Sequence, residues 1–199
     1  MFINLSRRLL ATAAVLGIMA AAPALAADGK QLFADKGCTA CHGEDANTPL
    51  QEGYPRLSGQ NPEYVFNQLK DIKAGARTNG QTNDTMKPIV EDLSEGDMRA
   101  LADFLGTLPR PQTVQAPSPG KQLYLTKTCV ACHGKDGMKP LLKTYPALAG
   151  QDKAYIVAQA KDIQGGIRKN GGSNAMQPVM HLVSDAELDS IAEFLANVK

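Results

Sequence analysis

The residues with the clearest chemistry form two Cys-x-x-Cys-His motifs. Each motif supplies two thiols and one imidazole, from Cys38, Cys41 and His42 in the first copy and from Cys129, Cys132 and His133 in the second. On a helical turn, residues i, i+3 and i+4 share a face. Both thiols can then reach the two vinyl groups at one haem edge, and the imidazole lies under the iron as its proximal ligand. This spacing is the attachment signature of c-type haem, and it predicts two covalently bound haem c groups.

A disulfide or a zinc site would also use closely spaced cysteines. Redox-active Cys-x-x-Cys pairs usually occur beside a strand–helix pattern, which this sequence lacks. A zinc site of this type needs two cysteine pairs about 15–20 residues apart, whereas Cys41 and Cys129 are 88 residues apart. The recurrence of the whole motif at equivalent positions of a repeat favours haem over both alternatives.

The sixth ligand of the iron indicates whether a haem protein transfers electrons or reacts with a small molecule. A methionine thioether opposite the histidine closes the iron and raises its potential, whereas an open position admits small molecules. Beyond the N-terminal segment the methionines are Met86, Met98, Met138, Met176 and Met180. Met86 and Met176 align and each precedes x-Pro in an expected loop, so they are predicted as axial ligands. Met98 is expected in a core, Met138 aligns with no methionine, and Met180 is the rival in the second copy.

The haem motifs belong to a tandem repeat. The run Gly-Lys-Gln-Leu at 29–32 recurs at 120–123, with an offset of 91. The run Tyr-Pro-x-Leu-x-Gly-Gln at 54–60 recurs at 145–151 with the same offset. Because this period is far longer than the roughly 20–50 residues of a solenoid repeat, the sequence predicts two copies of one domain.

The repeat divides the chain into a first domain at 28–108, a linker at 109–119 and a second domain at 120–199. Four prolines in the linker predict an extended, semi-rigid connection. The two halves differ in charge, since residues 28–111 have a net charge of −4 and residues 112–199 a net charge of +3. A molecule polarised in this way is expected to orient in the electric field of a partner.

Both copies are expected to be all-α. Asn61 followed by Pro62 predicts the start of a helix, and Gly75 suits its end. Ser94 and Ser184 carry capping signals before segments with one apolar stripe at helical spacing. No segment shows sustained alternation of apolar and polar residues, so no substantial sheet is expected.

The first 26 residues are interpreted as a secretory signal peptide. Arg7 and Arg8 precede an apolar run at 9–22, and Ala24-Leu25-Ala26 is a small-x-small cleavage site. The run is shorter than the roughly 18 residues that a membrane span needs. The rest of the chain is therefore predicted to be exported.

The composition excludes several classes of protein. The chain has 199 residues, of which 43% are hydrophobic and 21% charged, and its formal net charge is +1. A nucleic-acid-binding protein would show a basic excess, and a disordered chain would be poor in apolar residues and strongly charged. Four cysteines are too few for a disulfide-dense scaffold. A globular protein without a nucleic-acid partner is expected.

Three further residues stand out as polar side chains whose role the motifs leave open. Arg77 and Arg168 align within Gly-x-Arg-x-Asn, where each is either the partner of a buried haem propionate or a solvated loop residue. His181 is the one histidine outside the haem motifs. It is interpreted as a surface or structural residue, with an alternative ligand role as the competing reading.

Together these motifs resemble the cytochrome c4 family. The Tyr-Pro-x-Leu-x-Gly-Gln runs at 54–60 and 145–151, with the paired Met-x-Pro segments, narrow the resemblance beyond a generic c-type cytochrome. It covers residues 28–199 and implies two tandem class I cytochrome c domains, each wrapping a haem in a few helices. One departure from the repeat is His181, which stands where the first copy has Glu91.

The resemblance implies a periplasmic carrier of single electrons and not an enzyme. Members of the family look like shuttles from a quinol-oxidising cytochrome bc complex to a terminal oxidase, and some associate loosely with the membrane. The implied partners are thus redox proteins. Two alternatives are a haem-bearing electron-acceptor subunit of a periplasmic dehydrogenase and a dihaem peroxidase. A peroxidase should lose one axial methionine, yet both copies keep theirs.

Overall fold

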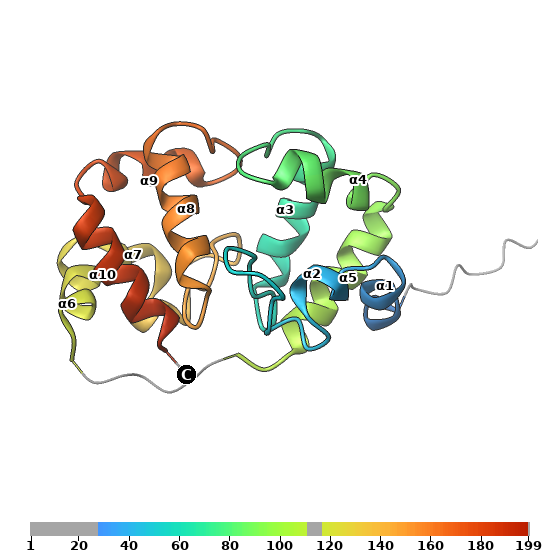
Figure 1. Cartoon of the computed structure of the whole chain (residues 1–199), viewed down its shortest axis with the longest axis horizontal. Helices are drawn as coiled ribbons and strands as arrows, with labels where there is room; N and C mark the ends of the chain where they lie inside the picture. The colour runs from blue at the N-terminus through green and yellow to red at the C-terminus, as the bar shows by residue number, and fades with distance from the viewer. Residues whose placement is uncertain (1–27, 111–116, 199) are drawn as a thin grey trace, which may run out of the picture.

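The computed structural model describes residues 28–110 and 117–198, and every regular element in these ranges is helical. The predicted signal peptide at 1–26 lies outside the described residues, as do positions 111–116 of the predicted linker. Figure 1 shows two groups of helices side by side, one from each half of the chain, with α3 and α8 facing each other between them. None of the described helices is long and apolar enough to cross a lipid bilayer.

The first domain consists of short α-helices and one π-helical turn. In chain order they are α1 (Gly29–Asp35), α2 (Thr39–His42), α3 (Pro62–Lys73), η1 (Thr82–Met86), α4 (Lys87–Val90) and α5 (Glu95–Thr107). The carboxylate of Asp28 accepts hydrogen bonds from the backbone amides of Lys30 and Gln31. It thereby satisfies donors that the first turn of α1 leaves unpaired. Both α1 and α3 pack against α5.

The second domain repeats this arrangement. Its elements are α6 (Pro119–Thr126), α7 (Cys129–His133), the 3₁₀ turn η2 (Lys135–Gly137), α8 (Lys153–Gln164), α9 (Ser173–Met180) and α10 (Asp185–Ala196). Both α6 and α8 pack against α10, so α10 takes the place that α5 has in the first domain. The predicted all-α fold is confirmed, and its two halves are built on one plan.

A glycine begins each repeat because two helices cross closely there. A Cβ atom on Gly29 would overlap the backbone carbonyl of Ala100 on α5. A Cβ atom on Gly120 would overlap the carbonyl of Ser190 on α10 in the same way. The recurrence of glycine at the start of both Gly-Lys-Gln-Leu runs is thus a packing requirement of the helix crossing.

Each domain has its own apolar core, built around a tilted aromatic pair. The ring centroids of Phe33 and Phe104 are 5.9 Å apart in the first core. Those of Tyr124 and Phe194 are 5.7 Å apart in the second. Met98 is buried in the first core, as expected from its position on the apolar stripe of α5. Each fully buried large apolar side chain contributes about 1.5–3 kcal/mol to folding.

The helix starts that the sequence predicts are confirmed, with one difference in how a start is stabilised. α3 begins at Pro62, and Ser94 and Ser184 each form a full capping box. Asn61 precedes α3 but makes no capping hydrogen bond. Its side-chain amide instead donates to the carbonyl oxygen of Tyr145 in the other domain, at 2.6 Å.

Candidate haem site

The first Cys-x-x-Cys-His motif consists of the N-cap residue Cys38 and the short helix α2, the second forms the short helix α7, and a glycine follows each. Gly43 has a φ of 81° and Gly134 a φ of 75°, a conformation that glycine adopts without strain. A Cβ atom at either position would also overlap a backbone carbonyl, that of Thr48 or Lys139 respectively. The loop after each motif therefore folds back over its helix, and only glycine fits at the turn.

A backbone carbonyl fixes the orientation of each motif histidine. Nδ1 of His42 lies 3.0 Å from the carbonyl oxygen of Pro55, and Nδ1 of His133 lies 3.0 Å from that of Pro146. Burial lowers the pKa of both imidazoles, although the carbonyl contact opposes the shift. Because a carbonyl oxygen only accepts, the neutral ring carries its proton on Nδ1. The lone pair of Nε2 is then free for a metal.

A single cavity connects the two motifs. Its volume is about 870 Å³, and residues of both domains line it. All the predicted ligand and attachment residues line this cavity, namely Cys38, Cys41, His42, Met86, Cys129, Cys132, His133 and Met176. Nε2 of His42 is buried and makes no hydrogen bond within the described residues. The thiol, imidazole and thioether groups of this cavity are the donor set that haem c uses.

The two methionines predicted as axial ligands lie in helical segments, so the expectation that they occupy loops was wrong. Met86 is the last residue of η1, and Met176 lies inside α9, two residues before Pro178. The rival Met180 is buried in the core of the second domain and also borders the cavity. Its counterpart in the first domain is Val90, which is buried in the same way and offers no ligand atom.

The two alternatives to haem find no support in the arrangement of the cysteines. None of the four cysteines is joined to another by a disulfide bond. Among residues 28–110 and 117–198, no three His, Cys, Asp or Glu side chains converge into a metal site. The two motifs lie one in each domain, as the predicted attachment of one haem per domain requires.

The last residue of the Tyr-Pro-x-Leu-x-Gly-Gln run joins the two domains. The side-chain amide of Gln60 donates to the carbonyl oxygen of Ala147 at 3.0 Å and accepts from the amide of Ala147 at 2.8 Å. Gln151 makes the same pair of bonds with the backbone of Arg56, at 2.9 and 2.7 Å. Each glutamine thus pairs with the variable position of the other copy's run, which gives this part of the motif a structural role.

The Gly-x-Arg-x-Asn segments meet in a buried network at the same boundary. Arg77 donates to the hydroxyl of Tyr155 at 3.0 Å and to Gln159 at 2.9 Å. Arg168 donates to the hydroxyl of Tyr64 at 3.1 Å, and both arginines also bond Gln68. Each guanidinium therefore crosses to the opposite domain, and the competing reading of a solvated loop arginine was wrong.

Two asparagines complete this network. Asn79 donates to the carboxylate of Asp162 at 2.7 Å, and Asn170 donates to that of Asp71 at 2.8 Å. The sequence signalled these positions only through their recurrence in both copies. Their partners are 83 and 99 residues away in the chain, so a search for local motifs does not find them.

Of the remaining residues that the sequence analysis names, two tyrosines border the cavity and one histidine does not. Tyr54 and Tyr145 border the cavity, with ring centroids 6.4 Å from those of His42 and His133 respectively. His181 follows the last residue of α9, is exposed and does not line the cavity. The interpretation of His181 as a surface residue is therefore the one that the structure supports.

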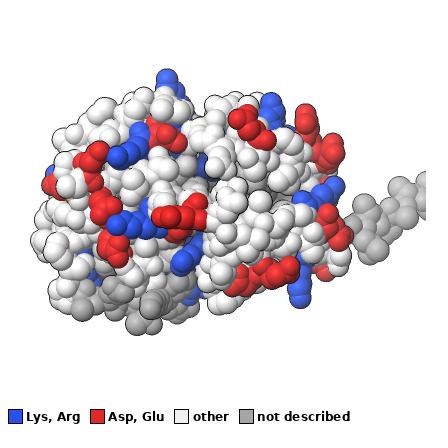
Figure 2. Space-filling model, in the orientation of Figure 1, with Lys and Arg blue, Asp and Glu red and all other residues white. Residues whose placement is uncertain are grey.

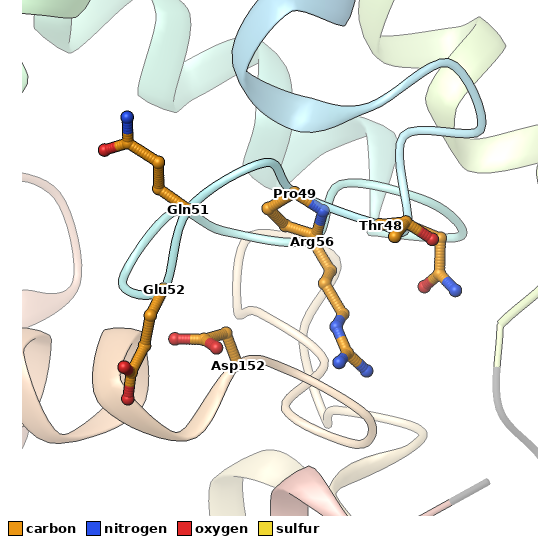
Figure 3. Close-up of a pocket in the computed structure, with 7 residues that line it drawn as sticks. Thr48, Pro49, Gln51, Glu52, Arg56 and Asp152 are labelled. Atoms are coloured by element: carbon orange, nitrogen blue, oxygen red, sulfur yellow. The ribbon is translucent and has the colours of Figure 1, made fainter.

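A second, smaller pocket lies where the first domain's loop meets the second domain. Its volume is about 200 Å³. Figure 3 shows that the carboxylates of Glu52 and Asp152 approach it from opposite domains and that Arg56 extends toward the second domain. Nη1 of Arg56 donates to the carbonyl of Gly150 at 2.9 Å, and Asp152 accepts from the amide of Gly53 at 3.0 Å. This pocket is therefore a gap within the interface between the two domains.

The helical fold, the repeated attachment motifs and the shared cavity define a c-type cytochrome with two haem domains. The profile of the cytochrome c family matches residues 26–109 and 117–199. Over 206 residues, the chain is 34% identical to the thiosulfate dehydrogenase electron acceptor of Stutzerimonas stutzeri (strain A1501), covering 94% of this chain and 93% of the relative. Also over 206 residues, it is 31% identical to cytochrome c4 of Azotobacter vinelandii, covering 94% and 95%.

A solved structure agrees with these relatives. Reduced recombinant cytochrome c4 from Pseudomonas stutzeri has a TM-score of 0.73 to this chain at 27% identity, covering 86% of this chain and 97% of that one. The chain belongs to the cytochrome c4 family of dihaem cytochromes c. It carries two covalently bound haem c groups and is an electron carrier, not an enzyme.

Proposed function

We propose that this protein accepts single electrons from a periplasmic dehydrogenase of the kind that oxidises thiosulfate, and passes them to a further redox protein. The observation that carries the proposal is the 34% identity, over 94% of this chain, to a relative named as the electron acceptor of thiosulfate dehydrogenase. The continuous cavity also supports a carrier role, because it brings both haem sites to one domain boundary. An electron that enters through one domain then has a short route to the other.

In this proposal the sites have the following composition. Each haem is attached through two thioethers and held by one histidine and one methionine, from Cys38, Cys41, His42 and Met86 in the first domain and from Cys129, Cys132, His133 and Met176 in the second. Haem bound in this way supplies a one-electron Fe(III)/Fe(II) couple with no open coordination position.

The protein's own residues set the conditions for rapid transfer. The carbonyls of Pro55 and Pro146 hold the two imidazoles in one orientation and one tautomer, so the rings do not rearrange when the charge of the site changes. Arg77 and Arg168 line the cavity and supply two buried positive charges, which suit the propionate carboxylates of haem. The apolar core residues around the cavity keep water away from both sites.

A second candidate is the route from a quinol-oxidising cytochrome bc complex to a terminal oxidase. The observation that favours it is the 31% identity to cytochrome c4 over 94% of this chain. Both candidates place the protein in the periplasm after removal of the predicted signal peptide at 1–26. They differ only in the protein that delivers the electron.

The test compares the two donors directly. Oxidised protein is mixed with thiosulfate and a purified thiosulfate dehydrogenase, or with a quinol and a purified cytochrome bc complex, and haem reduction is followed by absorbance. The proposal predicts full reduction of both haems in the first mixture, with no reduction when the dehydrogenase is omitted. Reduction by the bc complex alone would overturn it in favour of the second candidate.

A further inference from the structure

An exposed leucine lies beside the second attachment cysteine of each domain. The amide of Leu50 donates to the carbonyl of Cys41 at 3.1 Å, and the Leu50 side chain is 67% exposed. The amide of Leu141 donates to the carbonyl of Cys132 at 2.9 Å, and the Leu141 side chain is 73% exposed. Side chains this apolar and this exposed contribute nothing to either core. Their recurrence beside the haem attachment points indicates a contact surface.

The charges around Leu141 are positive. Lys135, Lys139 and Lys143 are all exposed on the segment 135–143, and none of them forms an ion pair within the described residues. The only acid of this segment, Asp136, is buried and neutralised by Lys121 at 3.1 Å. The adjoining Leu142 is 47% exposed and widens the apolar centre. We call this surface, which combines two exposed leucines with three exposed lysines of one segment, the basic face.

The same positions of the first domain carry the opposite charge. Glu44 and Glu52 align with Lys135 and Lys143, and Asp45 is exposed where its counterpart Asp136 is buried. Within the described residues, none of these three carboxylates forms an ion pair. The segment 44–52 is thus an acidic face around Leu50, built on the same backbone as the basic face.

The two faces are more specific than the charge difference between the domains. Figure 2 shows acidic and basic side chains interspersed over most of the visible face, with a short run of acidic side chains along the lower edge of the first domain. A partner approaching at random would therefore meet both charges. In the described part of each haem attachment segment, the unpaired charges have one sign and share the segment with an exposed leucine.

We propose that the basic face docks a redox protein with an acidic rim around an apolar centre, and that the acidic face docks a second redox protein with a basic rim. This inference rests on the proposed function as an electron carrier and adds the surface through which each partner is recognised. Complementary charges steer the encounter, and like charges at the other face reject the wrong partner. The leucines supply the apolar contact that remains when salt screens the charges.

The test uses two protein probes, an acidic plastocyanin and a basic single-haem cytochrome c, with electron exchange followed by stopped flow. Lys139→Glu should slow exchange with plastocyanin about tenfold at low ionic strength, the lower end of what electrostatic steering contributes. Lys169→Glu is the matched control, since Lys169 is exposed in the same domain but follows α8 at the opposite end from the basic face. It should leave the rate nearly unchanged.

The acidic face is tested in the reverse sense. Glu44→Lys should slow exchange with the basic cytochrome c, whereas Asp103→Lys, a change of an exposed acid on α5, should not. Leu141→Ser should slow electron exchange with plastocyanin at both low and high salt, because salt ions do not screen an apolar contact. Equal effects of Lys139→Glu and Lys169→Glu, or no effect of either, would overturn the proposal.

The outcome is separable from that of the proposed function. Exchange with the probes needs neither thiosulfate nor a dehydrogenase, so the docking faces can be established even if the thiosulfate route fails. Conversely, reduction by the dehydrogenase that is insensitive to the charge reversal on each face and to Leu141→Ser would retain the route and reject the faces. Haem absorbance and circular dichroism of each variant confirm that it is folded and loaded.

Discussion

The first and second domains have the same arrangement of helices. In the second domain, however, additional polar contacts hold the segment that follows the haem motif. Tyr124 stands where the first domain has Phe33, and its hydroxyl donates to the carbonyl of Gly134 at 2.7 Å. Lys121 pairs with the buried Asp136, whereas the aligned Lys30 is exposed. The second domain therefore ties the segment after its haem motif to α6 by two contacts that the first domain does not make.

The solvent-exposed surfaces of the two domains also differ, and here the second domain is the more apolar one. Among the described residues, the large apolar side chains that are exposed include one in the first domain and five in the second: Leu50, and then Leu125, Leu141, Leu142, Ile167 and Leu182. The glutamine, arginine and asparagine side chains of the interface network, in contrast, recur in both copies, as Gln60 and Gln151, Arg77 and Arg168, and Asn79 and Asn170. Two further interface positions have changed, since Arg56 aligns with Ala147 and Asn61 with Asp152.

The largest effect is expected from removing one attachment site. The double substitution Cys129→Ala and Cys132→Ala should leave the protein with one haem and an unfolded second domain, because each half is too small to be stable without its cofactor. Cys38→Ala with Cys41→Ala should do the same to the first domain. Intact mass and circular dichroism measure both. Loss of both haems from either variant would show that the domains do not stand independently.

The next effect concerns the axial ligands. Met86→Ala and Met176→Ala should each open one iron, which then binds carbon monoxide when reduced and falls in potential. Met180→Ala should leave both irons closed but lower the free energy of unfolding by about 2–5 kcal/mol, because it creates a core cavity. Redox titration and carbon monoxide difference spectra distinguish these results. An open iron in the Met180 variant would reverse the assignment in the second domain.

A smaller effect tests the buried ion pair of the second domain. Lys121→Met leaves Asp136 buried without its partner and should lower the free energy of unfolding by about 3–5 kcal/mol. Lys30→Met changes an exposed residue and should stay within about 0.5 kcal/mol of the parent. Denaturant titration of both variants gives the comparison. Similar losses in the two would mean that the pair has no particular role.

The smallest effect is expected for the tyrosine hydroxyl. Tyr124→Phe reproduces the residue type of the first domain and removes one hydrogen bond to Gly134. It should cost about 1 kcal/mol, the usual contribution of a single internal hydrogen bond. The midpoint of denaturation measures it. An unchanged midpoint would show that the hydroxyl contributes nothing to the anchorage of this segment.

Much of the fold could be predicted from sequence because its signals are local. Proline at the start of α3, serine caps before α5 and α10, and the fixed spacing of the haem motifs each act within a few residues. The cross-domain network could not be predicted in the same way. Arg77 donates to side chains on α8, and the side chain of Asn61 donates to the carbonyl of Tyr145 and makes no capping bond to α3. Such pairings depend on how the surfaces of the two domains fit together, and a pattern within a few residues of sequence does not contain that information.

The methionine segments show a further limit. Proline two residues after each methionine suggested a loop, yet α9 continues through Pro178, and Met86 closes a π-helical turn. Pro178 is the sixth residue of α9, so it lies past the first turn and removes the internal bond that its N–H would donate to the carbonyl four residues before it. The ligand residue types could thus be read from the repeat, whereas the backbone that presents them could not.

The reciprocity of the glutamine and arginine contacts bears on ancestry. A contact in which each side uses the same residues is the isologous contact of a twofold homodimer. A gene for one such domain would already have encoded both halves of the interface, and its product would have paired in proportion to its concentration. Two such copies joined in one polypeptide keep that pairing at any protein concentration. Each copy can then carry a surface of its own, which two identical subunits could never do.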